Sequence, residues 1–78
     1  MRTQREIPTV ATWDAGSAAC AQLIIGLHRQ VAPLCNGDAL AVIAPDAGAP
    51  ADLPAWCRMT GHVLLAAEHP NYIIQKKA

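Results

Sequence analysis

Residues 20–34 read CAQLIIGLHRQVAPL, and this stretch decides how the rest of the chain is interpreted. Its apolar side chains recur at spacings of three and four residues: Leu23, Ile24, Leu27, Val31 and Leu34. That spacing predicts an amphipathic helix that begins at Cys20 and buries one face. Gly26 lies inside this helix and costs about 1 kcal/mol relative to alanine, so the helix needs support from tertiary contacts. Pro33 and the pair Asn36-Gly37 are expected to end it.

Extended segments surround this helix along the chain. Residues 8–13 alternate in polarity and contain β-branched side chains, which predicts a strand. Residues 39–44 are apolar at both odd and even positions, as expected of a strand that is covered on both faces or of a central strand. Two further strands are predicted at residues 63–67 and 72–75, with a turn at residues 69–71 between them.

A second helix is predicted between the central strand and the last two strands. Residues 45–51 contain two prolines and a glycine and are expected to form a loop. Asp52 can accept from the first N–H groups of a helix, and Pro54 is tolerated in a first turn. The predicted buried face carries Leu53, Trp56, Cys57 and Thr60, and Gly61 is placed to end the helix in the left-handed conformation.

The predicted order of elements is therefore β-α-β-α-β-β. The compact way to bury these faces is an α+β two-layer sandwich, with two helices on one face of a four-stranded mixed sheet. A length of 78 residues allows a single domain, here 1–78, and residues 1–7 are expected to fray.

Composition excludes several classes of function. The chain is 53% hydrophobic and only 15% charged, so it is expected to fold. Its six basic and six acidic residues cancel, which argues against direct binding of nucleic acid. Its apolar runs are too short for a membrane span, no signal-type segment is present, and three cysteines make no disulfide framework. We expect a reduced, cytoplasmic protein that is compatible with a monomer.

The three cysteines differ in the chemistry that their positions allow. Cys20 lies where the first loop meets the first helix, and the helix dipole and free N–H groups there favour a thiolate. The same position also suits a small apolar residue that packs under the helix end. Cys57 shares the apolar face of the second helix and is expected to be structural. Cys35 has no arranged partner in the sequence.

The remaining polar residues favour structural roles. His62 is expected to be a capping or hydrogen-bonded residue, whereas His28 and His69 are expected to be exposed. Four aspartates fall at turns or caps, where they bind local backbone: Asp14, Asp38, Asp46 and Asp52. The tryptophans, Trp13 and Trp56, are expected to belong to the core. The spacing of cysteines and histidines predicts no metal site and no cofactor.

Taken in order, these residues resemble the TusA/SirA family of small sulfur carriers. Asp14 stands six residues before Cys20, Gly37 precedes an apolar strand, and Asp46 lies in the following loop. The most specific match is residues 52–62, DLPAWCRMTGH. Two features depart from the family pattern. The family signature Cys-Pro-x-Pro is Cys-Ala-Gln-Leu here, and the usual glycine three residues before the cysteine is Ser17, a possible N-cap.

The resemblance implies the same two-layer fold and a role for Cys20 as the catalytic residue. In this family, a cysteine at that position carries sulfane sulfur as a persulfide between a donor protein, a cysteine desulfurase or rhodanese type, and an acceptor protein. The expected activity is that of a sulfurtransferase-type carrier, with the N–H groups of Ala21 and Gln22 stabilising the anion. Cys57 ranks second, as a relay or resolving thiol.

Two other functions remain open from the sequence. A non-catalytic interaction module could keep the fold and lose sulfur transfer, which is consistent with the missing prolines. The architecture also recurs in the C-terminal domain of translation initiation factor 3, although the neutral charge disfavours RNA binding. The sequence does not identify the donor, the acceptor or the pathway.

Overall fold

The computed structural model describes residues 7–77, apart from the side chain of Cys20. Of residues 1–7, which were expected to fray, the first six lie outside this range. The elements follow the predicted order: β1 (Ala11–Asp14), α1 (Cys20–Val31), β2 (Ala39–Ile43), α2 (Ala49–Thr60), β3 (Val63–Glu68) and β4 (Asn71–Gln75).

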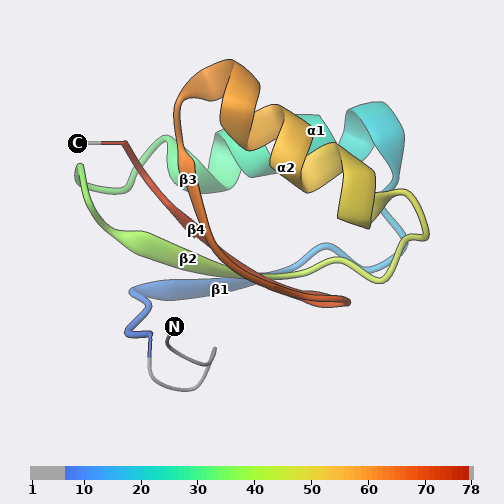
Figure 1. The fold of residues 1–78 in the computed structure, drawn as a ribbon, viewed down its shortest axis with the longest axis horizontal. Helices are drawn as coiled ribbons and strands as arrows, with labels where there is room; N and C mark the ends of the chain where they lie inside the picture. Colours follow the sequence, from blue (N-terminus) through green and yellow to red (C-terminus); the bar gives the residue numbers. More distant parts are fainter. Residues whose placement is uncertain (1–6, 78) are drawn as a thin grey trace.

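The strands form one mixed sheet in the order β1-β2-β4-β3. β1 pairs with β2 in parallel, whereas β4 pairs antiparallel with β2 and with β3. Both helices cover the same face of this sheet (Figure 1). The predicted α+β two-layer sandwich is confirmed, and so is the central position of the apolar strand, now β2.

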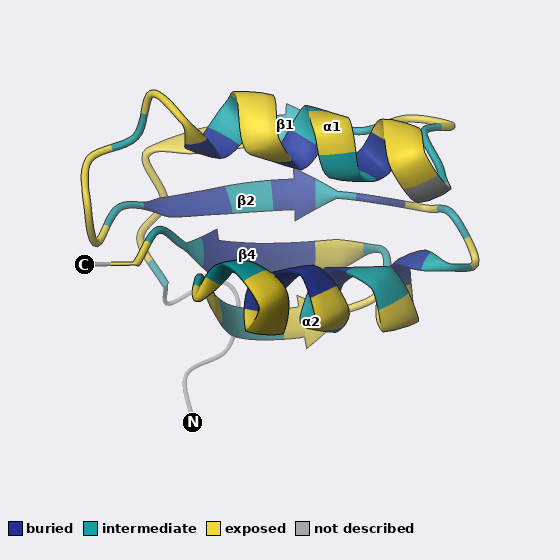
Figure 2. Ribbon diagram, turned by 90° about the horizontal axis from the view of Figure 1, so that it is seen from above, coloured by how far each residue is buried: buried dark blue, intermediate teal, exposed yellow. Residues whose placement is uncertain are grey.

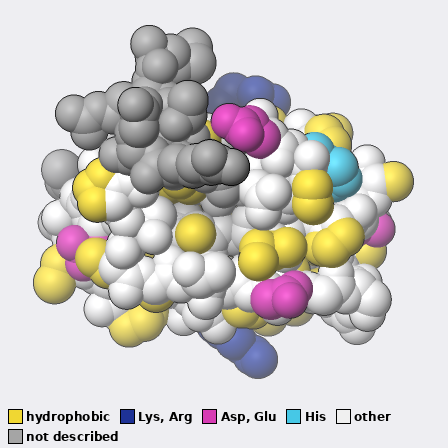
Figure 3. All heavy atoms as spheres, turned by 90° about the horizontal axis from the view of Figure 1, so that it is seen from below, with side chains coloured by type: hydrophobic (Ala, Val, Ile, Leu, Met, Phe, Trp, Pro, Cys, Tyr) yellow, Lys and Arg dark blue, Asp and Glu magenta, His cyan; other side chains and the backbone are white. Residues whose placement is uncertain are grey.

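The core lies between the helices and the sheet. Viewed from the helix side, the buried positions follow β2, β4 and the inner faces of both helices (Figure 2). The largest fully buried side chains are Trp56, Tyr72, Leu23, Leu27, Leu40, Leu53, Ile73, Ile74 and Val42. Among the described residues, every side chain in the buried class is apolar. On the opposite face of the sheet, apolar side chains lie scattered among backbone and other side chains (Figure 3).

Gly26 has a role in packing that its low helix propensity does not indicate. The ring of Trp13, on β1, packs directly against the Gly26 backbone on α1. A Cβ at residue 26 would overlap Cη2 and Cζ2 of that ring and would stand 3.4 Å from Cζ3. Trp13 itself is partly buried and packs against the core cluster. The glycine therefore lets an edge-strand tryptophan contact α1, which is the tertiary support that the helix requires.

The start of the second helix was predicted three residues too late. α2 begins at Ala49 with Gly48 as its N-cap, so residues 49–51 are helical rather than part of a loop. Pro50 occupies the first turn, where its missing N–H costs nothing. Pro54 instead lies inside the helix, and Asp52 is a first-turn residue rather than the cap. The predicted end is confirmed, because Gly61 has φ of 86° and its N–H donates to the Cys57 carbonyl at 2.9 Å.

The first strand is shorter than predicted, whereas the first helix ends just before Pro33, as predicted. β1 starts at Ala11, three residues later than expected, although the N–H of Val10 already donates to the Ala39 carbonyl at 2.9 Å. α1 ends at Val31 with Ala32 as its C-cap, because the following Pro33 cannot donate a helical hydrogen bond. Leu34 continues the apolar pattern but packs against the core from the turn beyond the helix.

Two consecutive lysines bind the carboxyl ends of the two helices. The Lys76 ammonium donates to the carbonyls of Ala32 (3.0 Å) and Leu34 (2.7 Å), just beyond α1. The Lys77 ammonium donates to the carbonyl of Thr60, the last residue of α2, at 3.2 Å. Cations at these positions complement the negative ends of the helix dipoles. The two residues that follow β4 thereby neutralise both helix C-termini.

Candidate functional site

One edge of the sheet gathers the starts of both helices. In the strand register, Asp14 of β1 lies beside Ile43 of β2, which pairs with Asn71 of β4, which pairs with Glu68 of β3. β1 and β2 are parallel and each leads into a helix, so both connecting loops leave from this edge. Cys20 is the first residue of α1 and therefore stands at this edge.

The start of α1 has no side-chain cap. Its N-cap is Ala19, with extended backbone angles (φ −138°, ψ 157°), and not Ser17 as predicted. The first turn also contains no acidic residue. The positive end of the helix dipole is therefore compensated neither by a capping oxygen nor by a first-turn carboxylate, and it favours an anion at Cys20.

One of the two N–H groups expected to bind that anion is already in use. The N–H of Gln22 donates to the Ala19 carbonyl at 3.1 Å, and the N–H of Leu23 approaches the same oxygen at 3.5 Å. This tight first turn makes the expectation for Gln22 wrong. The role expected of the Ala21 N–H stays a prediction.

The loops at this edge are held by aspartates that bind local backbone. Asp14 accepts from the Gly16 N–H at 2.8 Å, and Asp46 accepts from the Gly48 N–H at 2.9 Å. Asp38 does the same for the Cys35 N–H at 3.0 Å, although it lies at the opposite end of the sheet. The turn roles predicted for these three residues are confirmed. Each carboxylate thus shapes its own loop.

The two other cysteines differ sharply in exposure. Cys57 is only 4% exposed and packs in the core, and burial raises the pKa of its thiol to about 11. A thiol in this environment is a structural apolar group, and the second-rank role as a resolving thiol gains no support. Cys35 is exposed, in the connection that follows α1 at the far end of that helix from Cys20.

The sequence also matches a known protein family over most of its length. Residues 11–76 match the sequence model of the family described as sulfurtransferase TusA. This segment spans all six elements of the fold. The chain belongs to the TusA family.

Individual relatives within the TusA family are similar over most of their length. A protein of Neisseria meningitidis serogroup A, named as a candidate sulfur carrier, is 45% identical over 60 residues, which cover 77% of this chain and 81% of that protein. The sulfur carrier protein TusA of Pseudomonas entomophila is 38% identical over 72 residues, 87% of this chain and 90% of the relative. TusA of Pseudomonas paraeruginosa is 35% identical over 75 residues, or 91% and 95% of the two chains. The resemblance inferred from residues 52–62 and from Cys20 is therefore confirmed at the level of the family.

The histidines of this TusA-family chain make specific contacts that the sequence did not reveal. His62 accepts the Lys77 N–H on Nδ1 at 3.1 Å, which confirms the predicted hydrogen-bonded role. His69 is exposed as predicted, yet its Nδ1 lies 2.6 Å from the hydroxyl of the buried Tyr72. His28 is also exposed, and its Nε2 accepts the indole N–H of Trp56 at 3.2 Å.

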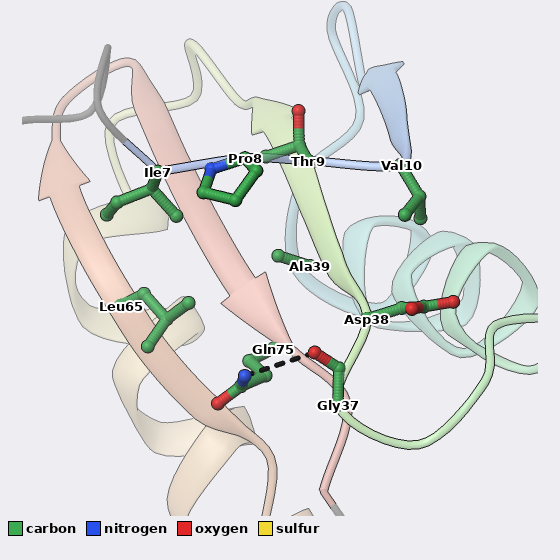
Figure 4. Close-up of a pocket in the computed structure, with 9 residues that line it drawn as sticks. All are labelled: Ile7, Pro8, Thr9, Val10, Gly37, Asp38, Ala39, Leu65 and Gln75. Atoms are coloured by element: carbon green, nitrogen blue, oxygen red, sulfur yellow. Dashed lines mark hydrogen bonds between the residues drawn. The ribbon is translucent and has the colours of Figure 1, made fainter.

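A cavity of about 560 Å³ lies on the face of the sheet away from the helices (Figure 4). Its lining is mainly apolar and contains no cysteine or histidine: Ile7, Pro8, Thr9, Val10, Gly37, Asp38, Ala39, Leu65 and Gln75. Gln75 is held by a hydrogen bond from its side-chain amide to the Gly37 carbonyl at 3.1 Å. The cavity is thus separate from the edge that carries Cys20.

The described residues offer little support for other kinds of site. Among the described side chains, which do not include that of Cys20, no three from histidine, cysteine, aspartate or glutamate lie close enough together to hold a metal ion. Neither α1 nor α2 has the length and apolar character that a helix needs to cross a membrane.

Proposed function

We propose that this chain is a sulfur carrier that holds sulfane sulfur as a persulfide on Cys20. It would receive the sulfur from a donor protein, of the cysteine desulfurase or rhodanese type, and pass it to an acceptor protein. One observation carries the proposal: Cys20 is the first residue of α1, within the segment that matches the TusA family. The relatives named above are described as sulfur carriers.

The electrostatics at the start of α1 support this role. A thiolate or persulfide anion is stabilised by the positive end of a helix dipole and by N–H groups in the first turn. The first turn of α1 has no acidic residue and no side-chain cap to compete for these groups, whereas His28 and Arg29 occupy the last turn. The helix also begins at Cys20 without the two prolines of the family signature, so their absence leaves this position of the cysteine intact.

The proposed transfer is an exchange between sulfur atoms with no net oxidation. The Cys20 thiolate attacks the outer sulfur of the donor's persulfide, and a bond forms between Cys20 Sγ and that sulfur. The S–S bond of the donor breaks, and its electron pair leaves with the donor's cysteine sulfur as a thiolate. An acceptor thiolate then attacks the outer sulfur on Cys20 in the same way, which returns Cys20 to its thiolate form.

The environment of Cys57 supports the choice of Cys20 as the carrier. Because the Cys57 thiol is buried and its pKa is raised to about 11, few thiolates form there near neutral pH. Cys35 is accessible, but it lies in the connection beyond the C-terminal end of α1, away from the helix start that stabilises an anion.

The test is a mass measurement on the intact protein. After incubation with inorganic polysulfide, or with a cysteine desulfurase and cysteine, the mass should rise by one sulfur atom and return on treatment with a reducing agent. Cys20→Ser should abolish the increase. Cys35→Ser is the matched control, because it removes an exposed thiol and should leave the increase unchanged.

Two results would contradict the proposal. The first is a mass increase that persists in Cys20→Ser and disappears in Cys35→Ser. The second is an unmodified Cys20 under conditions that load a TusA protein of Pseudomonas treated in parallel. In the second case, retention of a bound partner by the unmodified protein would favour an interaction module.

A further inference from the structure

A cluster of aromatic rings joins the two helices at the end of the molecule away from Cys20. Trp56 on α2 is only 1% exposed, and its indole N–H donates to Nε2 of His28 on α1 at 3.2 Å. The ring of His62, which follows α2, lies against the same indole with a centroid distance of 5.1 Å and an interplanar angle of 36°. His28 meets Trp56 edge-on, at 5.3 Å and 81°.

The hydrogen bonds require both histidines to be neutral. An indole N–H and a backbone N–H can only donate, so the nitrogen that faces each of them must be the unprotonated nitrogen of its ring. For His28 this is Nε2, which faces Trp56. For His62 it is Nδ1, which accepts the Lys77 N–H at 3.1 Å. A proton on either nitrogen would place two donors against each other.

The charged groups at this end of the molecule also favour the neutral form of His62. The pKa of His62 is lowered by burial and by the nearby charges of Lys77, Lys76 and His28. The described charged groups at this end are Arg29 on α1, Arg58 on α2, Lys76 and Lys77 after β4, and Asp38 before β2. Asp38, the carboxylate in this group, binds the Cys35 N–H at 3.0 Å. The surroundings of His62 therefore favour its neutral form.

We propose that His28 and His62 form a proton-operated latch on Trp56. When both rings are neutral, the His28 bond ties the C-terminal half of α1 to α2, and the His62 bond ties the end of the chain to the end of α2. When the rings take up protons, both acceptors are lost, and the buried indole N–H is left without its acceptor. The C-terminal half of α1 then separates from α2. Attraction of a charged His62 to the indole face opposes this opening, and variants at each histidine distinguish the two contributions.

The test follows the indole N–H resonance of Trp56 by NMR from about pH 7.5 to about pH 5, the range in which histidine titrates. The Trp13 indole serves as an internal reference. The Trp56 resonance should shift with pH in the wild-type protein, and amide exchange in the last turn of α1 should accelerate at the acidic end. In His28→Gln, the amide oxygen can still accept from Trp56 but does not titrate, so most of the shift should disappear.

His62→Gln and His69→Gln complete the comparison. The urea midpoint should fall on acidification in the wild-type protein and in His69→Gln, and it should change less in His62→Gln and least in the variant with both His28→Gln and His62→Gln. A Trp56 resonance that does not titrate, or one that titrates equally in His28→Gln, would overturn the latch. Neither measurement depends on the sulfur chemistry of Cys20.

Discussion

Replacing Gly26 by alanine should destabilise the fold, although helix propensity alone predicts the opposite. Gly26 lies in the interior of α1, where alanine is ordinarily more stable by about 1 kcal/mol. In this structure, however, the added methyl would overlap two atoms of the Trp13 ring. The ring would have to withdraw from α1, or α1 would have to move away from the sheet.

The expected magnitude follows from these two opposing effects. Forcing an extra methyl into a packed contact costs about 1–3 kcal/mol. After the gain of about 1 kcal/mol in helix propensity, the free energy of unfolding should fall by up to about 2 kcal/mol. In a domain of this size, each kcal/mol lowers the midpoint of thermal unfolding by about 4–8 °C.

The assay is urea unfolding of four proteins: wild type, Gly26→Ala, Trp13→Val and the double variant. Removing the ring should reverse the sign of the alanine effect, so that Gly26→Ala stabilises the Trp13→Val background by about 1 kcal/mol. The coupling free energy of the cycle should then be about 1–3 kcal/mol. If Gly26→Ala stabilised the wild-type protein as much as it stabilised Trp13→Val, the ring contact would not be the reason for the glycine.

Two further predictions concern the core thiol and a helix end. At about pH 8, Cys57 should resist alkylation by iodoacetamide until urea unfolds the protein. A pKa of about 11 instead of 9.0 lowers the thiolate population of Cys57 about 100-fold. If mass spectrometry found Cys57 labelled as fast as Cys35, this prediction would be wrong. Lys76→Met should lower the free energy of unfolding by about 1 kcal/mol in urea titrations, because two carbonyls at the end of α1 lose a cationic donor. The exposed Arg58→Met is its charge-matched control, and equal losses in the two variants would show that the two hydrogen bonds contribute nothing.

Helices and strands could be predicted where a periodic pattern of apolar residues was followed by a residue that ends the element. The spacing of Leu23, Leu27 and Val31 identified α1, and the left-handed Gly61 ended α2 as expected. The start of α2 was misplaced because two prolines compete for the first turn. Pro50 takes that position, and Pro54 is tolerated inside the helix by a fold that buries its neighbour Leu53. Local propensity cannot rank these alternatives, since packing decides between them.

The candidate site was predictable in position but not in its hydrogen bonds. The residue pattern placed Cys20 at the start of α1, and the topology puts that start at a sheet edge. The sequence did not show that the Gln22 N–H would turn back to the Ala19 carbonyl, which is a matter of local helix geometry. It also could not show that His28 and Trp56, 28 residues apart, would share a hydrogen bond. Contacts of this kind exist only after the two helices pack side by side.

The topology itself makes the edge at Cys20 suitable for an anion. Because β1 and β2 are parallel and each is followed by a helix on the same face, α1 and α2 point the same way and place their positive ends at one edge. Two aligned dipoles repel each other, and the cost is reduced at the far end, where Lys76 and Lys77 donate to carbonyls at the two helix ends. At the near end, α2 has Asp52 in its first turn, whereas α1 has no acidic residue. An anionic sulfur on Cys20 would supply the negative charge that the start of α1 otherwise lacks.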